Sequence, residues 1–308
     1  MYKIKEKPED FEVEEITNIA PKEKGKYSLW WMTKTNYTTQ DAISKIAKKL
    51  RTKERLIGFA GTKDKKAVTK QLISVAYTPK HRIKTLSLQD ISLEFYGFSE
   101  NPVSLGDLEG NSFKIIIRNL DEIPDIENKQ VKNFYGEQRF SKQNAEIGKL
   151  IIKRDFKKAA EMIAETEDKV KEYLEENKTD YVGALRKLQI KVLKLYAHSY
   201  QSYMWNKTAE KAEEDKEIPI IGFDTETEDA KMKEMMKEEG ITYRDFIIKQ
   251  IPELSSEGGK RELFVKPTNF SITEKGEDEL NENKKKIKLE FSLPKGSYAT
   301  EVIRQLFS

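Results

Sequence analysis

Two kinds of hydrophobic periodicity divide this chain into three parts. Residues 11–16 (FEVEEI) alternate apolar and acidic side chains, and residues 287–293 (IKLEFSL) alternate in the same way near the other end. A period of two predicts half-buried strands. Residues 142–214, in contrast, have a helical period and few glycines or prolines. This order of strands, helices and strands predicts an α+β fold in which a helical domain is inserted into a sheet domain.

Further elements follow from spacing and turn residues. Apolar side chains between residues 43 and 50 recur at i, i+3, i+4 and i+7, which predicts a helix capped by Thr38 or Thr39. The same reasoning predicts strands at 26–35, 71–77, 92–98 and 113–118, a loop with Gly106, Gly110 and Asn111 between the last two, a charged helix at 229–251 broken at Gly240, and a terminal helix at 297–307.

The composition excludes several kinds of chemistry. The 308 residues contain no cysteine and only two histidines, His81 and His198. Disulfides, thiolate metal sites and cysteine nucleophiles are therefore excluded. With only two histidines, a histidine metal centre or a Ser-His-Asp triad is disfavoured. No apolar run approaches a membrane span, and the N-terminal MYKIKEKPED lacks an apolar signal core. We expect a soluble, cytoplasmic protein that binds no metal.

Charge is distributed unevenly along the chain. Charged residues make up 35% of it, with a net charge of +3. Residues 41–70 hold ten basic side chains against three acidic ones, whereas residues 207–239 hold twelve acidic side chains against six lysines. The basic window suits phosphate contacts, although runs of charge are more often solvated faces. Abundant Lys and Glu without Cys indicate a thermophile, or alternatively an AT-rich genome.

A single acid stands in a cationic turn at residues 58–71 (GFAGTKDKKAVTKQ). Asp64 is surrounded in sequence by four lysines and preceded by Gly58 and Gly61. Nearby cations favour the ionised carboxylate, as a nucleophile or base requires. The glycines permit unusual backbone angles and close approach of a ligand. A solvated surface turn explains the same residues without any chemistry.

Two stretches are rich in aromatic residues, and the first is a candidate for binding a base. Residues 133–141 (NFYGEQRFS) interleave aromatic side chains with hydrogen-bonding ones, as recognition of an extruded base requires. Residues 196–206 (YAHSYQSYMWN) place Tyr196, Tyr200 and Tyr203 on one helix face. Aromatic stripes are more often core, and helix packing is the favoured interpretation of the second stretch.

Five segments in order resemble the TruD-type tRNA pseudouridine synthases, whose eukaryotic relatives include Pus7. They are PEDFEVEEI (8–16), GTKDKKAVTKQ (61–71), LGDLEGNSFKIIIR (105–118), NFYGEQRFS (133–141) and LPKGSYATEVIRQL (293–306). The resemblance covers nearly the whole chain and looks like an archaeal member. It implies a catalytic core with a mixed, largely antiparallel sheet at residues 1–145 and 260–308, and an inserted, mainly helical TRUD domain at 146–259.

The resemblance also implies an activity. Members of the family isomerise uridine in tRNA to pseudouridine without a cofactor, most often uridine 13 in the D-arm. Asp64 takes the place of the catalytic aspartate, and the resemblance leaves open whether it attacks ribose or uracil or abstracts a ribose proton. One basic neighbour is expected to pair with Asp64. We expect RNA as the partner and a monomeric enzyme.

The remaining site residues are carried over from the two most specific motifs. Gly61 and Lys63, with Lys65 beside them, complete the aspartate motif, and the second motif supplies Asn133, Phe134, Tyr135 and Arg139. Tyr135 stands where the family places its stacking aromatic. The family often has Tyr-Phe at the positions of Phe134-Tyr135 and Gly at the position of Ser141, so the tyrosine hydroxyl and the local loop geometry are departures.

Two other classes of function stay open on sequence grounds. A catalytically silent RNA-binding or RNA-chaperone protein has the same fold but needs no catalytic acid, and the intact Asp64 motif favours the enzyme. A structural or interaction protein with a charged helical domain is the third interpretation, and it requires that the ordered motifs be coincidence.

Overall fold

The chain divides into two compact units in a computed structural model, which describes residues 1–214, 216–227 and 229–307. The sheet unit comprises residues 1–129, 266–299 and 307. The helical unit comprises residues 130–265 and 300–306. These divisions by internal contact fall near, but not at, the boundaries expected for an inserted domain at 146–259, and the extent of that domain stays a prediction.

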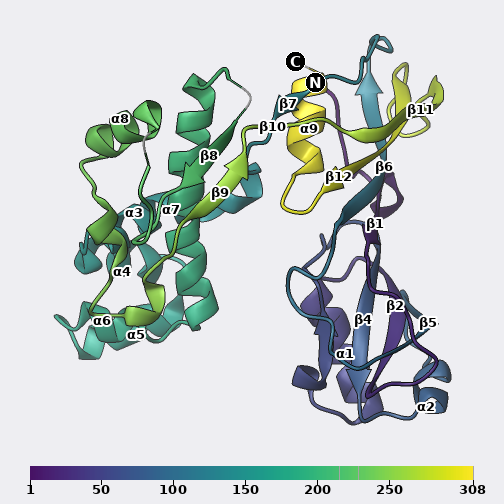
Figure 1. Cartoon of the computed structure of the whole chain (residues 1–308), viewed down its shortest axis with the longest axis horizontal. Helices are drawn as coiled ribbons and strands as arrows, with labels where there is room; N and C mark the ends of the chain where they lie inside the picture. The colour runs from purple at the N-terminus through teal and green to yellow at the C-terminus, as the bar shows by residue number, and fades with distance from the viewer. Residues whose placement is uncertain (215, 228, 308) are drawn as a thin grey trace. The chain divides into compact units, whose positions relative to one another are not determined.

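The sheet unit contains an eight-stranded sheet in the order β11-β12-β6-β1-β4-β2-β5, with β3 added beside β4 (Figure 1). Among the described pairs, β1 and β4 run parallel and the others run antiparallel. This confirms the α+β class with a mixed, largely antiparallel sheet. The strands are β1 (Phe11–Ile16), β2 (Tyr27–Thr35), β3 (Ile57–Phe59), β4 (Val68–Ala76), β5 (Ile91–Ser99), β6 (Gly110–Leu120), β11 (Thr268–Glu277) and β12 (Lys285–Pro294).

One face of this sheet is covered by α1 (Thr39–Leu50), which Thr38 caps through its side chain. The apolar stripe predicted from the i, i+3, i+4 spacing is buried against strand residues such as Trp30 and Ile73. Burying each large apolar side chain in this way contributes about 1.5–3 kcal/mol. The short helices of the unit are η1 (Pro8–Asp10), η2 (Glu54–Leu56) and α2 (Lys80–Lys84).

One expectation for the sheet unit was wrong, and one strand was not predicted. Gly110 and Asn111 do not lie in a loop but begin β6, where Gly110 pairs with Pro294 of β12. A Cβ at Gly110 would lie 2.3 Å from the Leu293 carbonyl oxygen, so glycine allows the strands to pair this far. The edge strand β11 was missed because most of its side chains are exposed on both faces, which removes the period-two signal.

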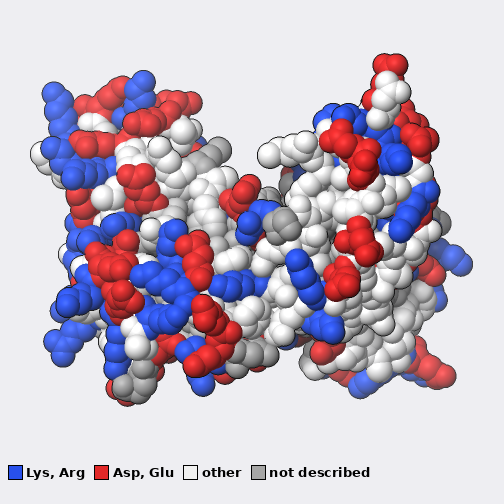
Figure 2. Space-filling model, turned by 90° about the horizontal axis from the view of Figure 1, so that it is seen from above, with Lys and Arg blue, Asp and Glu red and all other residues white. Residues whose placement is uncertain are grey.

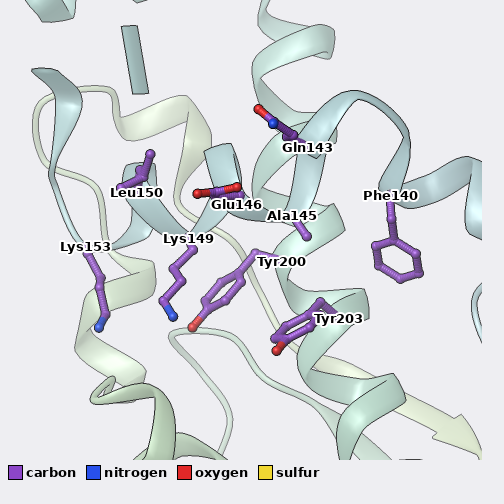
Figure 3. A pocket seen from close by; sticks show the side chains of 9 residues that line it. All are labelled: Phe140, Gln143, Ala145, Glu146, Lys149, Leu150, Lys153, Tyr200 and Tyr203. Atoms are coloured by element: carbon purple, nitrogen blue, oxygen red, sulfur yellow. The ribbon is translucent and has the colours of Figure 1, made fainter. Parts of the chain in front are cut away.

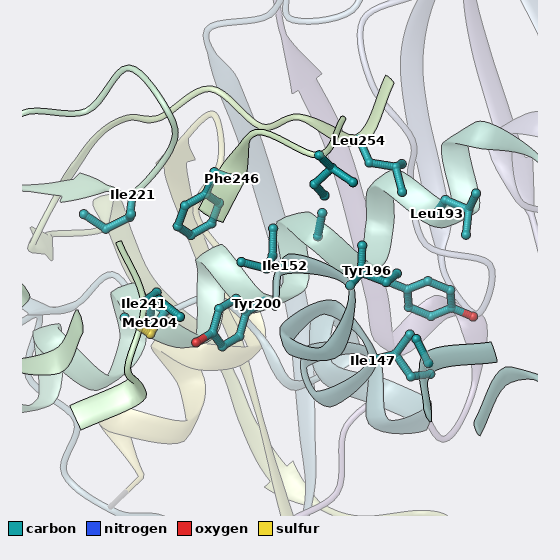
Figure 4. Packing of buried hydrophobic residues seen from close by; sticks show 14 of the residues in the cluster. Ile147, Ile152, Leu193, Tyr196, Tyr200, Met204, Ile221, Ile241, Phe246 and Leu254 are labelled. Atoms are coloured by element: carbon teal, nitrogen blue, oxygen red, sulfur yellow. The ribbon is translucent and has the colours of Figure 1, made fainter. Parts of the chain in front are cut away.

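The helical unit is built around α7 (Ile190–Lys211), as residues 142–214 predicted. Its buried residues include Tyr196, Tyr200 and Met204, which join Ile147, Phe246 and others in one hydrophobic cluster (Figure 4). The other elements are η3 (Glu137–Gln143), α3 (Asn144–Ile152), α4 (Phe156–Ala164), α5 (Asp168–Glu176), α6 (Tyr181–Leu185), α8 (Ala230–Glu239), η4 (Tyr243–Phe246), η5 (Pro252–Leu254) and α9 (Ala299–Leu306). Two strand pairs complete the unit: β7 (Val131–Lys132) with β10 (Phe264–Val265), and β8 (Glu217–Ile220) with β9 (Gly259–Glu262).

Charges on the helical unit are largely paired locally. On the face visible in Figure 2, Lys and Arg side chains are intermixed with Asp and Glu over the helical unit. Within the acidic window, Lys216 lies 2.9 Å from Asp229 and Lys211 lies 3.0 Å from Glu238. This window therefore forms a solvated, ion-paired surface. Within the described ranges, no helix is long and apolar enough to span a membrane.

Candidate active-site residues

Asp64 lies on the loop that joins β3 to β4, the two strands of a hairpin. Its side chain is 32% exposed, so the carboxylate is accessible without being free in solvent. The loop connects a short strand to one whose first residues, from Val68, pair with both β1 and β2. The sheet therefore fixes one end of this loop firmly, and the acid stands three residues before that end.

Buried polar side chains hold the backbone of the Asp64 loop. Lys34 Nζ donates to the Asp64 carbonyl oxygen at 2.8 Å, and the Lys63 amide donates to Thr39 Oγ1 at 2.9 Å. Gln71 Nε2 donates to the Gly61 carbonyl oxygen at 2.9 Å, and Gln71 in turn accepts from Thr39 at 2.8 Å. Satisfied buried networks of this kind rigidify their surroundings. The loop is thus held at three backbone positions, Gly61, Lys63 and Asp64.

Lys34 is the most unusual member of this network because it is fully buried. Burial lowers the pKa of Lys34 to about 8, and the nearby negative charge of Asp64 acts in the opposite direction. Its ammonium also donates to the Tyr37 carbonyl oxygen. A buried lysine is costly unless its donors are used, and here they are used to fix the loop.

The cation that pairs with the Asp64 carboxylate is Lys5, far away in sequence. Lys5 Nζ donates to Asp64 Oδ2 at 2.9 Å and lies 3.9 Å from the centre of the Phe11 ring. An aromatic face attracts an ammonium group, so Phe11 helps to place Lys5. The sequence motif contains no sign of this pair, because Lys5 stands before the first strand.

The lysines next to Asp64 in sequence have other contacts. Lys63 points into the unit, where Nζ lies 2.8 Å from Glu15 Oε2 and donates to Asn111 Oδ1 at 2.8 Å. Lys70 pairs with Glu14 at 2.7 Å. Lys65 and Lys66 are exposed. The expectation that a basic neighbour in the motif pairs with Asp64 was therefore wrong, since the pairing cation, Lys5, comes from outside the motif.

The proposed role of the glycines needs correction. Neither Gly58 nor Gly61 has a backbone angle restricted to glycine. A Cβ at Gly58 would lie 2.2 Å from the Val103 carbonyl oxygen, so that glycine permits close packing within the protein. A Cβ at Gly61 would have no described atom within 4 Å. Open space at Gly61 is compatible with a ligand approaching the main chain, and its role stays a prediction.

In the helical unit, the side chain of Asn206 fixes the main chain of Tyr135. Its amide donates to Asn206 Oδ1 at 2.9 Å, and its carbonyl oxygen accepts from Asn206 Nδ2 at 3.0 Å. The ring is half-buried, meets Trp205 edge-on at 5.7 Å, and lies 4.2 Å from the Arg261 guanidinium carbon. A ring fixed at its main chain and edge, with part of its surface exposed, suits stacking on a planar group.

The other residues of this motif have mainly internal contacts. Asn133 is buried; its Oδ1 accepts from Arg261 at 2.8 Å, and its carbonyl oxygen accepts from the same guanidinium. Arg139 Nε donates to Ser202 Oγ at 3.1 Å. Phe134 is partly buried against the hydrophobic cluster. Their expected contacts with a base or ribose stay predictions.

The candidates fall into two groups, one on each unit. Gly61, Lys63, Asp64 and Lys65 share one loop of the sheet unit, and Asn133, Phe134, Tyr135 and Arg139 share one segment of the helical unit. Sequence analysis missed Lys5, Lys34, Asn206 and Arg261. The burial of Lys34 could have been predicted from the sequence. It follows Ser28, Trp30 and Met32 at a spacing of two in β2, and these alternate residues face the interior. Among the described residues, no group of three or more His, Asp or Glu side chains is placed to hold a metal.

Comparison with known proteins identifies the class. A family model described as tRNA pseudouridine synthase D (TruD) matches residues 2–172, 163–218 and 207–306. The tRNA pseudouridine synthase D of Aquifex aeolicus is 30% identical over 383 aligned positions, covering 99% of this chain and 98% of that protein. A relative from Methanosarcina mazei is also 30% identical, covering 98% of this chain and 92% of the relative.

A solved structure agrees with the sequence comparisons. The crystal structure of a TruD protein from Methanosarcina mazei superimposes with a TM-score of 0.75 at 28% identity, covering 98% of this chain and 92% of the other. The sheet and the helical unit thus define the class of the pseudouridine synthases. The chain belongs to the family of tRNA pseudouridine synthase D, TruD. The resemblance drawn from the five motif segments is confirmed.

Proposed function

We propose that this protein isomerises uridine to pseudouridine in tRNA, with Asp64 as the catalytic carboxylate. The observation that carries the proposal is the Asp64 loop: a partly exposed carboxylate paired with one ammonium group, on a backbone held by three buried side chains. Such preorganisation places a reacting group without further ordering during the reaction. A purely structural turn has no need of it.

The reaction requires little besides a carboxylate and a bound base. The glycosidic bond between C1′ and N1 breaks, the uracil turns, C1′ bonds to C5, and C5 loses its proton while N1 gains one. An ionised Asp64 serves either as the nucleophile or as the base that removes a ribose proton. Lys5 Nζ holds Oδ2 at 2.9 Å, and Oδ1 is the oxygen proposed to react.

We assign Tyr135 the stacking role for the target uracil. A uridine inside an RNA stem must leave its stack before an enzyme can act on it, and an aromatic platform lowers that cost. The partial exposure of Tyr135 and its fixed backbone support this role. The family often has phenylalanine at this position, so tyrosine keeps the stacking ring and adds a hydroxyl. That hydroxyl is proposed to assist removal of the C5 proton. A Tyr135→Phe variant with an unchanged rate would contradict that role.

The target is proposed to be uridine 13 of the D-arm, reached through phosphate contacts with the basic window at residues 41–70. Lys45, Lys48 and Lys49 are exposed on α1 and available for such contacts. Binding of tRNA should therefore weaken steeply as salt rises. The protein is further proposed to act as a thermostable monomer in the cytoplasm.

Tritium release separates the enzyme from a silent RNA-binding protein. With tRNA labelled at uracil C5, the wild-type protein should release tritium, and Asp64→Asn should not, while both bind tRNA equally. Lys84→Gln, an exposed lysine on α2, is the control and should behave as wild type. Binding of tRNA without release by the wild-type protein would favour the RNA-chaperone alternative.

A further inference from the structure

The helical unit contains a pocket of about 530 Å³ that the proposed function does not use. It lies among η3, α3 and α7 and is lined by Phe140, Gln143, Lys149, Lys153, Tyr200 and Tyr203, with other residues around them (Figure 3). Its volume falls within the roughly 300–1,000 Å³ of ordinary ligand sites. Two of its tyrosines belong to the stripe that the sequence indicated as helix packing.

The inner wall of this pocket is a rigid aromatic surface. Tyr200 and Tyr203 stack with ring centroids 6.2 Å apart and an interplanar angle of 14°. The Tyr200 hydroxyl donates to Glu239 Oε2 at 2.9 Å, and Lys149 Nζ lies 2.8 Å from the same oxygen. The polar ends of Tyr200 and Lys149 are therefore occupied. Helix packing explains Tyr200, which is buried, but leaves Tyr203 half-exposed towards the pocket.

The outer wall combines the groups that bind nucleotides. In Figure 3, Phe140 and Tyr203 lie towards one end of the pocket, while Lys153 lies at the opposite end, beyond Lys149. Phe140 is partly exposed and Lys153 is exposed. Lys153 Nζ forms no ion pair within the described part of the chain. Aromatic rings with an amide and a lysine nearby are the usual surroundings of an unpaired RNA base and its phosphate.

The pocket is adjacent to the residue that stacks on the target base. Asn206, which holds the Tyr135 backbone, follows Tyr203 on α7 by three residues, a rise of about 4.5 Å along the helix. From the other side, η3 begins at Glu137, two residues after Tyr135, and carries Phe140 and Gln143. The same two elements therefore support both the stacking ring and the pocket.

We propose that the pocket binds one nucleotide that neighbours the target uridine in the RNA, a subsite that rests on the proposed function. Its base lies against Phe140 and Tyr203, and its phosphate lies towards Lys153. Glu146 lines the same pocket, and Glu239 pairs with the lining residue Lys149, so the site suits a single nucleotide rather than a run of phosphates. Holding a neighbour in this way stabilises the unstacked strand.

The test measures tRNA binding in Phe140→Ala, with Phe140→Trp as the matched control that keeps a stacking ring. Loss of one stacked base costs about 1–3 kcal/mol, so Kd should rise about 5- to 150-fold for alanine, by the tenfold per 1.4 kcal/mol conversion. Tryptophan should restore binding. The effect should fall on Kd and KM rather than on kcat measured at saturating tRNA.

Abasic substitutions in the tRNA identify the nucleotide. Removing the base next to the target uridine should weaken binding to the wild-type protein, with no further loss in Phe140→Ala. Full additivity of the two losses, or an unchanged Kd in Phe140→Ala with a native circular dichroism spectrum, overturns the proposal. Weaker tRNA binding by Phe140→Ala in a protein that never releases tritium would instead retain the subsite and contradict the proposed activity.

Discussion

The sheet unit contains two sites at which carboxylates pair with cations, and the two sites have different roles. At the first, Lys5 is the one ion-pair partner of Asp64 among the described residues, and the Asp64 side chain stays 32% exposed. At the second, Arg118 is 2% exposed and lies 2.8 Å from both Asp10 and Asp278. The first carboxylate is partly exposed, whereas the second site uses its carboxylate oxygens within the protein.

The hydrogen-bond partners of the carboxylate distinguish the structural acid, Asp278, from the proposed reactive acid, Asp64. Asp278 accepts from Arg118, from the Asn119 amide at 2.9 Å and from the Leu280 amide at 3.0 Å. Burial opposes the shift, yet these hydrogen bonds lower the pKa of Asp278 to about 2. An acid held this way ties β6 to the turn between β11 and β12. A carboxylate with every oxygen occupied has no capacity left for a substrate.

The largest expected effect is on stability, at the second site. Asp278→Asn leaves part of the Arg118 charge buried without compensation, and breaking a buried ion pair costs about 3–5 kcal/mol of unfolding free energy. Urea denaturation should show this loss. Glu279→Gln is the control, because Glu279 also contacts Arg118 at 2.9 Å but is 49% exposed. Equal losses in the two variants would contradict the distinction by burial.

Removing the support of the Asp64 loop should come next. Lys34→Met keeps the length of the side chain but leaves the Asp64 carbonyl oxygen without its donor. A shift of the catalytic carboxylate by about 1 Å costs about 100-fold in rate, so single-turnover tritium release should slow by about that factor. Lys84→Met controls for the loss of a lysine. An unchanged rate in a folded Lys34→Met protein would show that the loop is fixed without it.

The sequence predicted the sheet unit better than the site within it. The alternation of apolar and polar residues predicted β1 and β12, and the i, i+3, i+4 spacing with Thr38 as cap predicted α1. These patterns depend only on near neighbours in the chain. The Asp64–Lys5 pair joins residues 59 positions apart, and only the folded chain brings them together. Arg261 and Tyr135 are separated still further.

Charge near an acid in sequence was also a poor guide to its partner. Lys63 turns inward to Glu15 because the loop enters β4 beside β1, which carries Glu15 on its buried face. For Lys34, the sequence could have predicted a buried hydrogen-bond acceptor, because a lysine on the buried face of a strand requires one. The identity of that acceptor, the Asp64 backbone, depended on the tertiary fold.

Acid should weaken the second site by a smaller amount. Because the folded pKa of Asp278 is about 2 and the ordinary value is 3.8, its contribution is complete above about pH 5 and is lost as pH falls through 2. The shift corresponds to about 2 kcal/mol. Unfolding free energies of the wild-type protein should fall over this range more steeply than those of Asp278→Asn. Parallel pH profiles would contradict the depressed pKa.

The smallest expected effect distinguishes Lys5 from the lysines of the motif. Lys5→Met removes the partner of the Asp64 carboxylate, while the three backbone supports of the loop remain. A partly exposed pair is worth about 1 kcal/mol, so tritium release should slow about tenfold or less. Lys65→Met, at an exposed lysine beside Asp64, should leave the single-turnover rate at saturating tRNA unchanged. If the Lys65 variant slows release and the Lys5 variant does not, then proximity in sequence, and not the contact in the folded chain, identifies the partner of the acid.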